Sequence, residues 1–126
     1  MNVAALKEFC AGLTGSTERH YKAPYNILVF QVGDKTFAYF KTSDPEKWRF
    51  SLRVTPERFL ELTDRPGIKP ARYRGRYHWV TIVKVRSMPE DYLAELVRAS
   101  HRRAFDALSR KKQLAIGGES GTLGLL

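Results

Sequence analysis

The sequence predicts a single α+β domain with an antiparallel sheet and with helices packed on one face of that sheet. Apolar residues recur at helical spacing in some segments and in short alternating or β-branched runs in others, so the expected order is helix, hairpin, strand, helix, strand, helix. Most links between the expected strands are short, which favours antiparallel neighbours. The chain has 126 residues, 43% of them hydrophobic, and can therefore bury a core of its own.

The first third of the chain predicts a helix followed by a hairpin. Residues 3–13 have apolar side chains at helical spacing, and glycines end the pattern. Residues 14–25 are mostly polar and predict a loop. The apolar run 27–32 and the aromatic run 36–41 flank a Gly-Asp-Lys turn at 33–35, which is typical of a β-hairpin.

Residues 48–54 predict a strand that leads into a helix. Apolar residues alternate there with Arg49, Ser51 and Arg53, so the strand should have one apolar and one basic face. A threonine and a proline at 55–56 should then start a helix that ends near Asp64. The threonine can cap the helix, and proline at the first helical position loses no hydrogen bond.

The second half predicts a connector, a strand and a long helix. The connector spans residues 65–78, and the strand spans residues 77–86. Ser87 and Glu90 have the spacing of a capping box. The apolar stripe that follows indicates a helix that runs to about Lys112.

Glycine and cysteine usage predict the domain boundary and the compartment. Residues 1–113 are expected to form one domain, and the glycine-rich residues 114–126 a flexible tail. Cys10 is the only cysteine, so neither an internal disulfide nor a cysteine zinc site can form, which favours the reducing cytoplasm. No apolar run approaches the ~20 residues of a membrane span, so no membrane partner is expected.

The chain is strongly basic. It carries 22 Lys and Arg residues against 13 Asp and Glu residues, a formal net charge of +9. Such an excess predicts an anionic partner, such as nucleic acid, an acidic protein or an anionic surface. A basic protein without a special partner is the alternative that the charge alone leaves open.

Seven of the basic residues lie between positions 65 and 86, where no acidic residue interrupts them. Aromatic residues are interleaved with them. Arginine forks suit phosphate oxygens, and aromatic faces can stack on unpaired bases. The alternative is a solvated loop and edge strand with Trp79 in the core. The candidate nucleic-acid-binding residues of this segment are Arg65, Lys69, Arg72, Tyr73, Arg74, Arg76, Tyr77, His78, Lys84 and Arg86.

Two further candidates are Arg49 and Arg53, which share one face of the expected strand. They extend the basic surface if that face is exposed. The alternative is that they pair with Glu57 or Glu61 on the helix that follows.

The sequence carries no signature of catalysis. His20, His78 and His101 lack the spacing of metal ligands, and neither a phosphate-cradling glycine loop nor a nucleophile elbow is present. We therefore expect no enzymatic activity, no metal and no cofactor. His78 lies in the basic segment and is the histidine to test, with a structural hydrogen bond as the alternative to acid–base chemistry.

Three segments resemble the MmcQ/YjbR family of small bacterial proteins. Residues 27–38, ILVFQVGDKTFA, resemble the hairpin of that family. Residues 50–57, FSLRVTPE, resemble its strand-into-helix step. Pro-Ala at 70–71, followed by HWVTI at 78–82, resembles its third segment. The order and spacing hold from about residue 3 to residue 112.

The resemblance implies a fold related to the CyaY-like group and a likeness to the double-wing domain of a phage transcription factor. It implies DNA binding and supplies no established catalytic residues. We therefore expect a cytoplasmic bacterial protein that contacts the phosphates of duplex DNA with little sequence specificity. The alternative is a protein-interaction or small-ligand module with an acidic partner. A monomer is favoured, although the sequence leaves the oligomeric state open.

Overall fold

The computed structural model describes residues 1–117, except for the side chain of Arg76. Its six strands form one antiparallel sheet of order β1-β2-β3-β4-β6-β5. The strands are β1 (Ser16–Tyr21), β2 (Ile27–Val32), β3 (Lys35–Lys41), β4 (Phe50–Arg53), β5 (Ile68–Pro70) and β6 (Trp79–Ile82). The α-helices are α1 (Val3–Ala11), α2 (Pro56–Thr63), α3 (Glu90–Asp106) and α4 (Arg110–Gly117), and the single 3₁₀ turns are η1 (Gly75–Tyr77) and η2 (Val85–Ser87). The predicted α+β class with an antiparallel sheet is confirmed.

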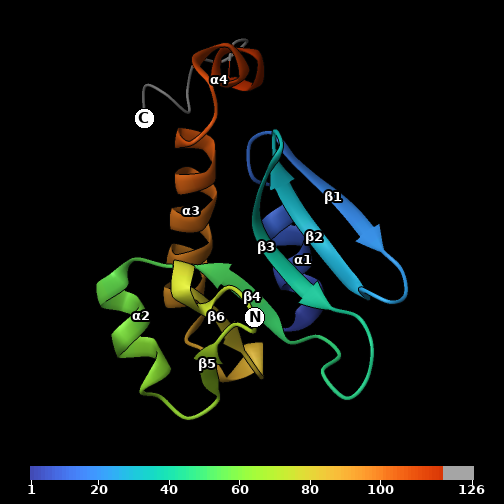
Figure 1. Cartoon of the computed structure of the whole chain (residues 1–126), viewed down its shortest axis with the longest axis vertical. Coiled ribbons are helices and arrows are strands. Elements are labelled where there is room, and N and C mark those ends of the chain that lie inside the picture. Colours follow the sequence, from blue (N-terminus) through green and yellow to red (C-terminus); the bar gives the residue numbers. More distant parts are fainter. Residues whose placement is uncertain (118–126) are drawn as a thin grey trace.

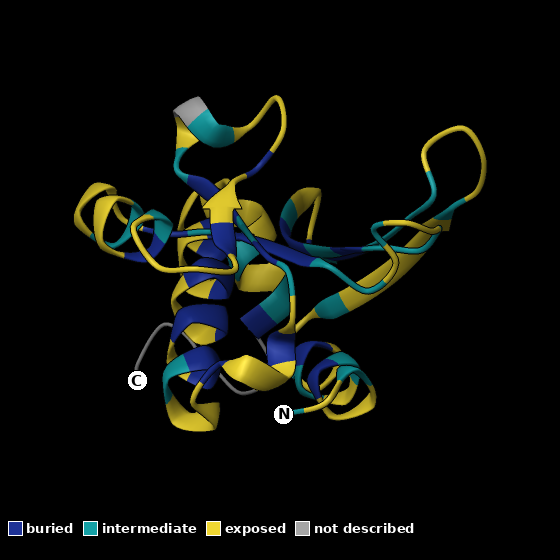
Figure 2. Ribbon diagram, turned by 90° about the horizontal axis from the view of Figure 1, so that it is seen from below, coloured by how far each residue is buried: buried dark blue, intermediate teal, exposed yellow. Residues whose placement is uncertain are grey.

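Helices α1 and α3 cover one face of the sheet (Figure 1). Figure 2 shows helices on one side of the sheet and exposed loops on the other. Phe50 of β4 and Val80 of β6 are fully buried against this helical layer, together with Leu93 and Val97 of α3. Because side chains alternate between the two faces of a strand, the residues between these core positions point to the face that the helices leave open.

Two turn and cap predictions are confirmed. Gly33 connects β2 and β3 with a φ of 61°, and a Cβ added there would lie 2.9 Å from a methyl carbon of Leu108. Glycine is therefore favoured at this position both by the backbone conformation and by the close approach of Leu108, which follows α3. At the start of α2, the backbone N–H of Arg58 donates to Thr55 Oγ1 at 3.2 Å, and Pro56 occupies the first turn.

One loop prediction and the bounds of one strand prediction were wrong. Strand β1 lies within residues 14–25, where the polar composition predicted a loop. It is an exposed edge strand without an apolar face, so its pairing with β2 is the source of its order. Within the strand predicted over residues 77–86, only Trp79–Ile82 form β6, and the residues on either side form the turns η1 and η2.

The start of α3 also differs from the prediction. Its N-cap is Pro89, which makes no side-chain cap. The hydroxyl of Ser87 instead donates to the carbonyl oxygen of Lys84 at 2.6 Å, so the predicted capping box with Glu90 does not form. The two acidic residues in the first turn of α3 favour its N-terminus electrostatically instead.

The predicted C-terminal helix is divided in two. Helix α3 ends at Asp106, and α4 starts at Arg110. The side-chain amide of Gln113 donates to the carbonyl oxygens of Phe105, in the last turn of α3, and of Leu108, just after it, which satisfies groups that a helix end leaves unpaired. Helix α4 includes residues 114–117, where a flexible tail was predicted. The rest of that predicted tail, residues 118–126, lies outside the described residues. No described helix is both long and apolar enough to cross a membrane.

Candidate nucleic-acid interface

One row of side chains crosses the open face of the sheet, which we define as the face opposite α1 and α3. Strand register aligns Val29 with Tyr39, Tyr39 with Ser51, Ser51 with Thr81, and Thr81 with Lys69. Directly opposed residues project from the same face of a sheet. Strands β2, β3, β4, β6 and β5 therefore each contribute one side chain to this row, and the row on the other face belongs to the core.

A hollow of about 490 Å³ lies on the open face. Tyr39 and Thr81 form part of its floor. Its walls come from loops at the two edges of the sheet: Tyr25 belongs to the β1–β2 loop, whereas Arg72 and Tyr73 belong to the loop between β5 and η1. The fold thus brings together segments that are far apart in the sequence.

The floor of the hollow contains a fixed aromatic and cationic cluster. The rings of Tyr39 and Trp79 lie 5.8 Å apart with an interplanar angle of 34°. The guanidinium carbon of Arg74 lies 5.6 Å from the centre of the Tyr39 ring and 5.2 Å from that of Trp79, which is within the range of a cation–π contact. Trp79 is only 6% exposed and projects from the same face of β6 as Thr81, so it packs beside Tyr39.

Positive charge surrounds the hollow. The cationic side chains that line it are Lys41, Lys69, Arg72 and Arg74. Within residues 1–117, no ion pair engages any of these four side chains. Glu46 is the one carboxylate among the lining residues, and it lies 3.5 Å from the guanidinium of Arg49. The hollow therefore presents excess positive charge to an anionic ligand.

Tyr73 lies on the rim of the hollow with an exposed aromatic ring. Its backbone is left-handed, with a φ of 67°, and its side chain is 90% exposed. Asn26, Trp48 and His78 also have a left-handed backbone, so the exposure of the ring is the feature that distinguishes Tyr73. An exposed aromatic ring beside unpaired cations is suited to stacking on a ligand.

Comparison with known proteins decides the family. The family model for YjbR matches residues 11–103. The chain belongs to the YjbR family. The YjbR protein of Escherichia coli K12, which is described as uncharacterised, is 26% identical over 115 residues, and the match covers 90% of this chain and 95% of that protein.

Two crystal structures are similar to this YjbR-family chain. One is a Deinococcus radiodurans protein of the DUF419 domain family, with a TM-score of 0.77 and 30% identity over 92% of this chain and 88% of that one. The other, from Pseudomonas syringae, has a TM-score of 0.66 and 20% identity over 82% of this chain and 99% of that one, and it shows the fold alone. The CyaY-like and double-wing likenesses stay predictions.

The β5–β6 hairpin of the YjbR fold separates the predicted basic residues into two groups. Ile68 pairs with Ile82 at one end of the hairpin, and Pro70 pairs with Val80 at the other. The first end is flanked by Arg65, Lys84 and Arg86. The second end is flanked by Arg72, Tyr73 and Arg74, and Lys69 lies between the two ends on the open face. The basic segment therefore converges only in part.

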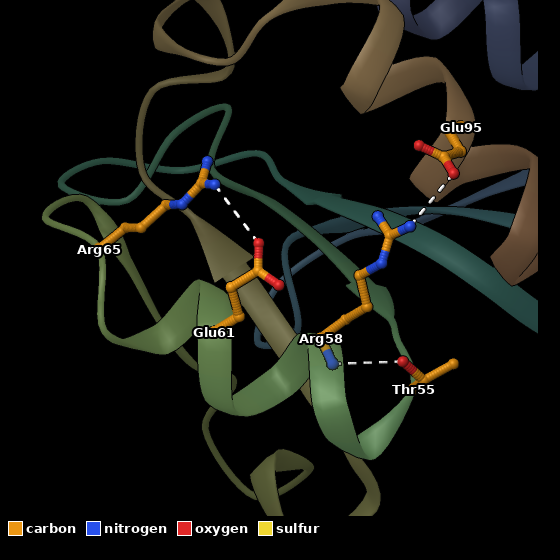
Figure 3. A network of polar contacts seen from close by, with 5 residues as sticks. All are labelled: Thr55, Arg58, Glu61, Arg65 and Glu95. Carbon is orange, nitrogen blue, oxygen red and sulfur yellow. Dashed lines mark hydrogen bonds and ion pairs between the residues drawn. The ribbon is translucent and has the colours of Figure 1, made fainter.

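Arg65 follows α2, forms an ion pair with a residue of that helix and does not line the hollow. Its guanidinium lies 3.5 Å from the carboxylate of Glu61, one helical turn earlier (Figure 3). Figure 3 also shows Arg58 of the same helix paired with Glu95 of α3, at 3.1 Å. Both pairs are exposed, so each adds little stability. Their effect here is to neutralise the individual charges of Arg58 and Arg65.

The strand predicted over residues 48–54 is shorter in the structure, since β4 begins at Phe50, and its two predicted arginines have other neighbours than expected. Arg49 pairs with Glu46 and not with an acidic residue of α2. Arg53 is half-buried, and desolvation followed by repulsion from Arg103 of α3 lowers the pKa of its guanidinium. The predicted basic face does not form, because Arg49 lies before β4 and is paired with Glu46, whereas Arg53 lies near Arg103 of α3.

Tyr77 and His78, which precede β6, do not line the hollow. The ring of His78 packs edge-on against Phe59 of α2, with 5.5 Å between centroids, and the His78 carbonyl accepts a hydrogen bond from the N–H of Val54. A structural role for His78 follows from these contacts. Tyr77 is 49% exposed on η1. The side chain of Arg76 lies outside the described residues.

Sequence reasoning missed Tyr25, Tyr39, Lys41, Ser51 and Thr81, which all line the hollow. A signal for Tyr39 was present, because it alternates with the apolar residues Ala38 and Phe40 and so had to face away from the core. The neighbours of Tyr39 across the sheet depend on strand order and register, which the sequence pattern does not specify.

Proposed function

We propose that this protein binds nucleic acid through the open face of its sheet, in the cytoplasm and without catalysing a reaction. The observation that carries the proposal is the set of four cations around one aromatic-lined hollow, none of them in an ion pair within residues 1–117. Duplex DNA, expected from the family resemblance, is one form of this partner.

Phosphate contacts supply most of the affinity in this proposal. Arginine and lysine side chains that neutralise phosphates release condensed counterions, so binding weakens steeply as salt is added. Arg72 is exposed on the rim, and Arg74 is held in place by the rings of Tyr39 and Trp79. A guanidinium held in this way loses little freedom when it contacts a phosphate.

The test compares two charge-matched double variants. Arg72→Ala with Arg74→Ala removes two cations from the hollow, whereas Lys84→Ala with Arg86→Ala removes two from the far end of the β5–β6 hairpin. We expect the first pair to weaken oligonucleotide binding at least about tenfold and to reduce the slope of log K against log salt by about 2. Fluorescence anisotropy at several salt concentrations measures both quantities.

The control pair should change affinity much less than the hollow pair. Equal losses from the two pairs would mean that only net charge matters. Absence of binding by the unmodified protein at low salt would reject nucleic acid as the partner.

A small anionic ligand is the second candidate for the same hollow. Its volume of about 490 Å³ falls within the range of small-molecule sites. A mononucleotide that saturates the protein as tightly as an oligonucleotide would favour this candidate, because a polymer-binding surface gains affinity with each added phosphate contact.

A further inference from the structure

We infer that the hollow on the open face accepts an unpaired nucleobase, so that the preferred partner is single-stranded nucleic acid and not duplex. This inference rests on the proposed function and names its substrate class. The argument depends on the shape of the surface, on the rings around it and on the position of its cations.

The first step concerns shape. Proteins that read duplex DNA insert a convex element, such as a helix or a two-stranded ribbon, into a groove. The cations here surround a concave surface instead, with walls from both edges of the sheet. The bases of a duplex are stacked inside it and cannot enter such a hollow, whereas the bases of a single strand can turn outward.

The second step concerns the aromatic rings. Tyr73 stands 90% exposed on one wall, and Tyr25 stands 65% exposed in the loop that forms the other. Tyr39 lies on the floor, where Trp79 and Arg74 fix its ring. Proteins that bind single strands combine such stacking platforms with a positively charged groove.

The third step concerns polar groups on the floor. The hydroxyls of Ser51 and Thr81 lie 2.7 Å apart and share one hydrogen bond. Ser51 is buried, but Thr81 is partly exposed within the hollow and can offer its hydroxyl to the edge of a base. Unpaired bases present such edges, and their donors and acceptors need partners when they are desolvated.

The fourth step concerns the phosphates. Lys41 on β3 and Lys69 on β5 lie on either side of β4 and β6, which carry Ser51 and Thr81. A base that enters between these lysines leaves the phosphates before and after it within reach of cations. Arg72 on the rim adds a third contact for the same backbone.

The experiment measures the affinities of one labelled oligonucleotide as a single strand, as a duplex and as a single strand with abasic sites, all at the same salt. A surface that uses phosphate contacts alone binds the duplex at least as tightly, because the duplex has the higher charge density. We expect the unmodified protein to bind the single strand about tenfold more tightly than the duplex or the abasic strand.

The variant Tyr73→Ala should lose about fivefold or more of its affinity for the single strand while its affinities for duplex and abasic strand stay nearly unchanged. Tyr73→Trp should restore the single-strand affinity, because it restores a stacking surface. Leu60→Ala removes another exposed apolar side chain, on α2, and serves as the matched control. Thermal melting of each variant verifies that it is folded.

The outcomes separate the two levels of the proposal. Equal binding of single strand and duplex, or a loss in Tyr73→Ala that is the same for abasic and normal strands, overturns the unpaired base and leaves nucleic-acid binding intact. Failure of all three oligonucleotides to bind overturns both.

Discussion

Tyr73 illustrates how single residues of this protein depart from what the fold alone requires. Its φ of 67° lies in the left-handed region, which costs a residue with a Cβ about 1–2 kcal/mol. Its ring is almost fully exposed and therefore adds little to the hydrophobic core. Trp48 and His78 share this backbone conformation, so what sets Tyr73 apart is its exposed ring, which is free to take the binding role proposed above.

The variant Tyr73→Gly should therefore separate stability from binding. Glycine adopts the left-handed region without a steric cost, although it gains entropy in the unfolded state. We expect the free energy of unfolding to stay the same or to rise by up to about 1 kcal/mol, while single-strand affinity falls. Urea denaturation and anisotropy on the same sample measure the two effects. A clear loss of stability would show that the ring supports the fold.

At the scale of secondary-structure elements, His101 connects α3 to the loop after α1. Its Nε2 lies 2.8 Å from the carbonyl oxygen of Thr14. A carbonyl oxygen can only accept, so the ring donates from Nε2, and a neutral ring satisfies this contact. The ring also packs edge-on against Phe37 of β3, with 5.1 Å between centroids. Desolvation in this position lowers the pKa of His101 below its usual value of 6.5.

The lowered pKa predicts the sign of a pH effect on stability. As the pH falls below 6.5, the unfolded chain binds a proton at His101 before the folded chain does, so the free energy of unfolding decreases. The variant His101→Gln can keep the bond to Thr14 but does not titrate, and its stability should change less between pH 7.5 and pH 5.5. Urea denaturation at both pH values checks this. An identical pH dependence in the two proteins would contradict the assignment.

The elements differ in how far the sequence predicts them. The hairpin at Gly33 and the start of α2 at Thr55 were predictable, because turns and caps are local chemistry. Strand β1 was not, because its polar residues become ordered only through pairing with β2. The row through Tyr39 and Thr81 was not predictable either, because it exists only once strand order and register are set.

At the scale of the whole molecule, the net charge of +9 is spread over more than one surface. A second hollow, of about 430 Å³, is lined by Lys7, Lys22 and Lys47 around Trp48. There the ammonium of Lys7 lies 3.8 Å from the centre of the Trp48 ring and covers it. The hollow on the open face differs, because the rings of Tyr25 and Tyr73 remain exposed. Charge alone would not distinguish the two surfaces, whereas exposed rings beside cations do.

The central claim, that the open face of the sheet is the nucleic-acid surface, is tested most directly by NMR chemical-shift mapping with a single-stranded oligonucleotide at low salt. The account predicts that the largest amide shifts cluster on the strands at Tyr39, Ser51 and Thr81 and on the loop 71–74, and that they diminish together as salt is added. Shifts that cluster instead on α1 and around Trp48, or that are scattered over both faces of the sheet, would contradict it.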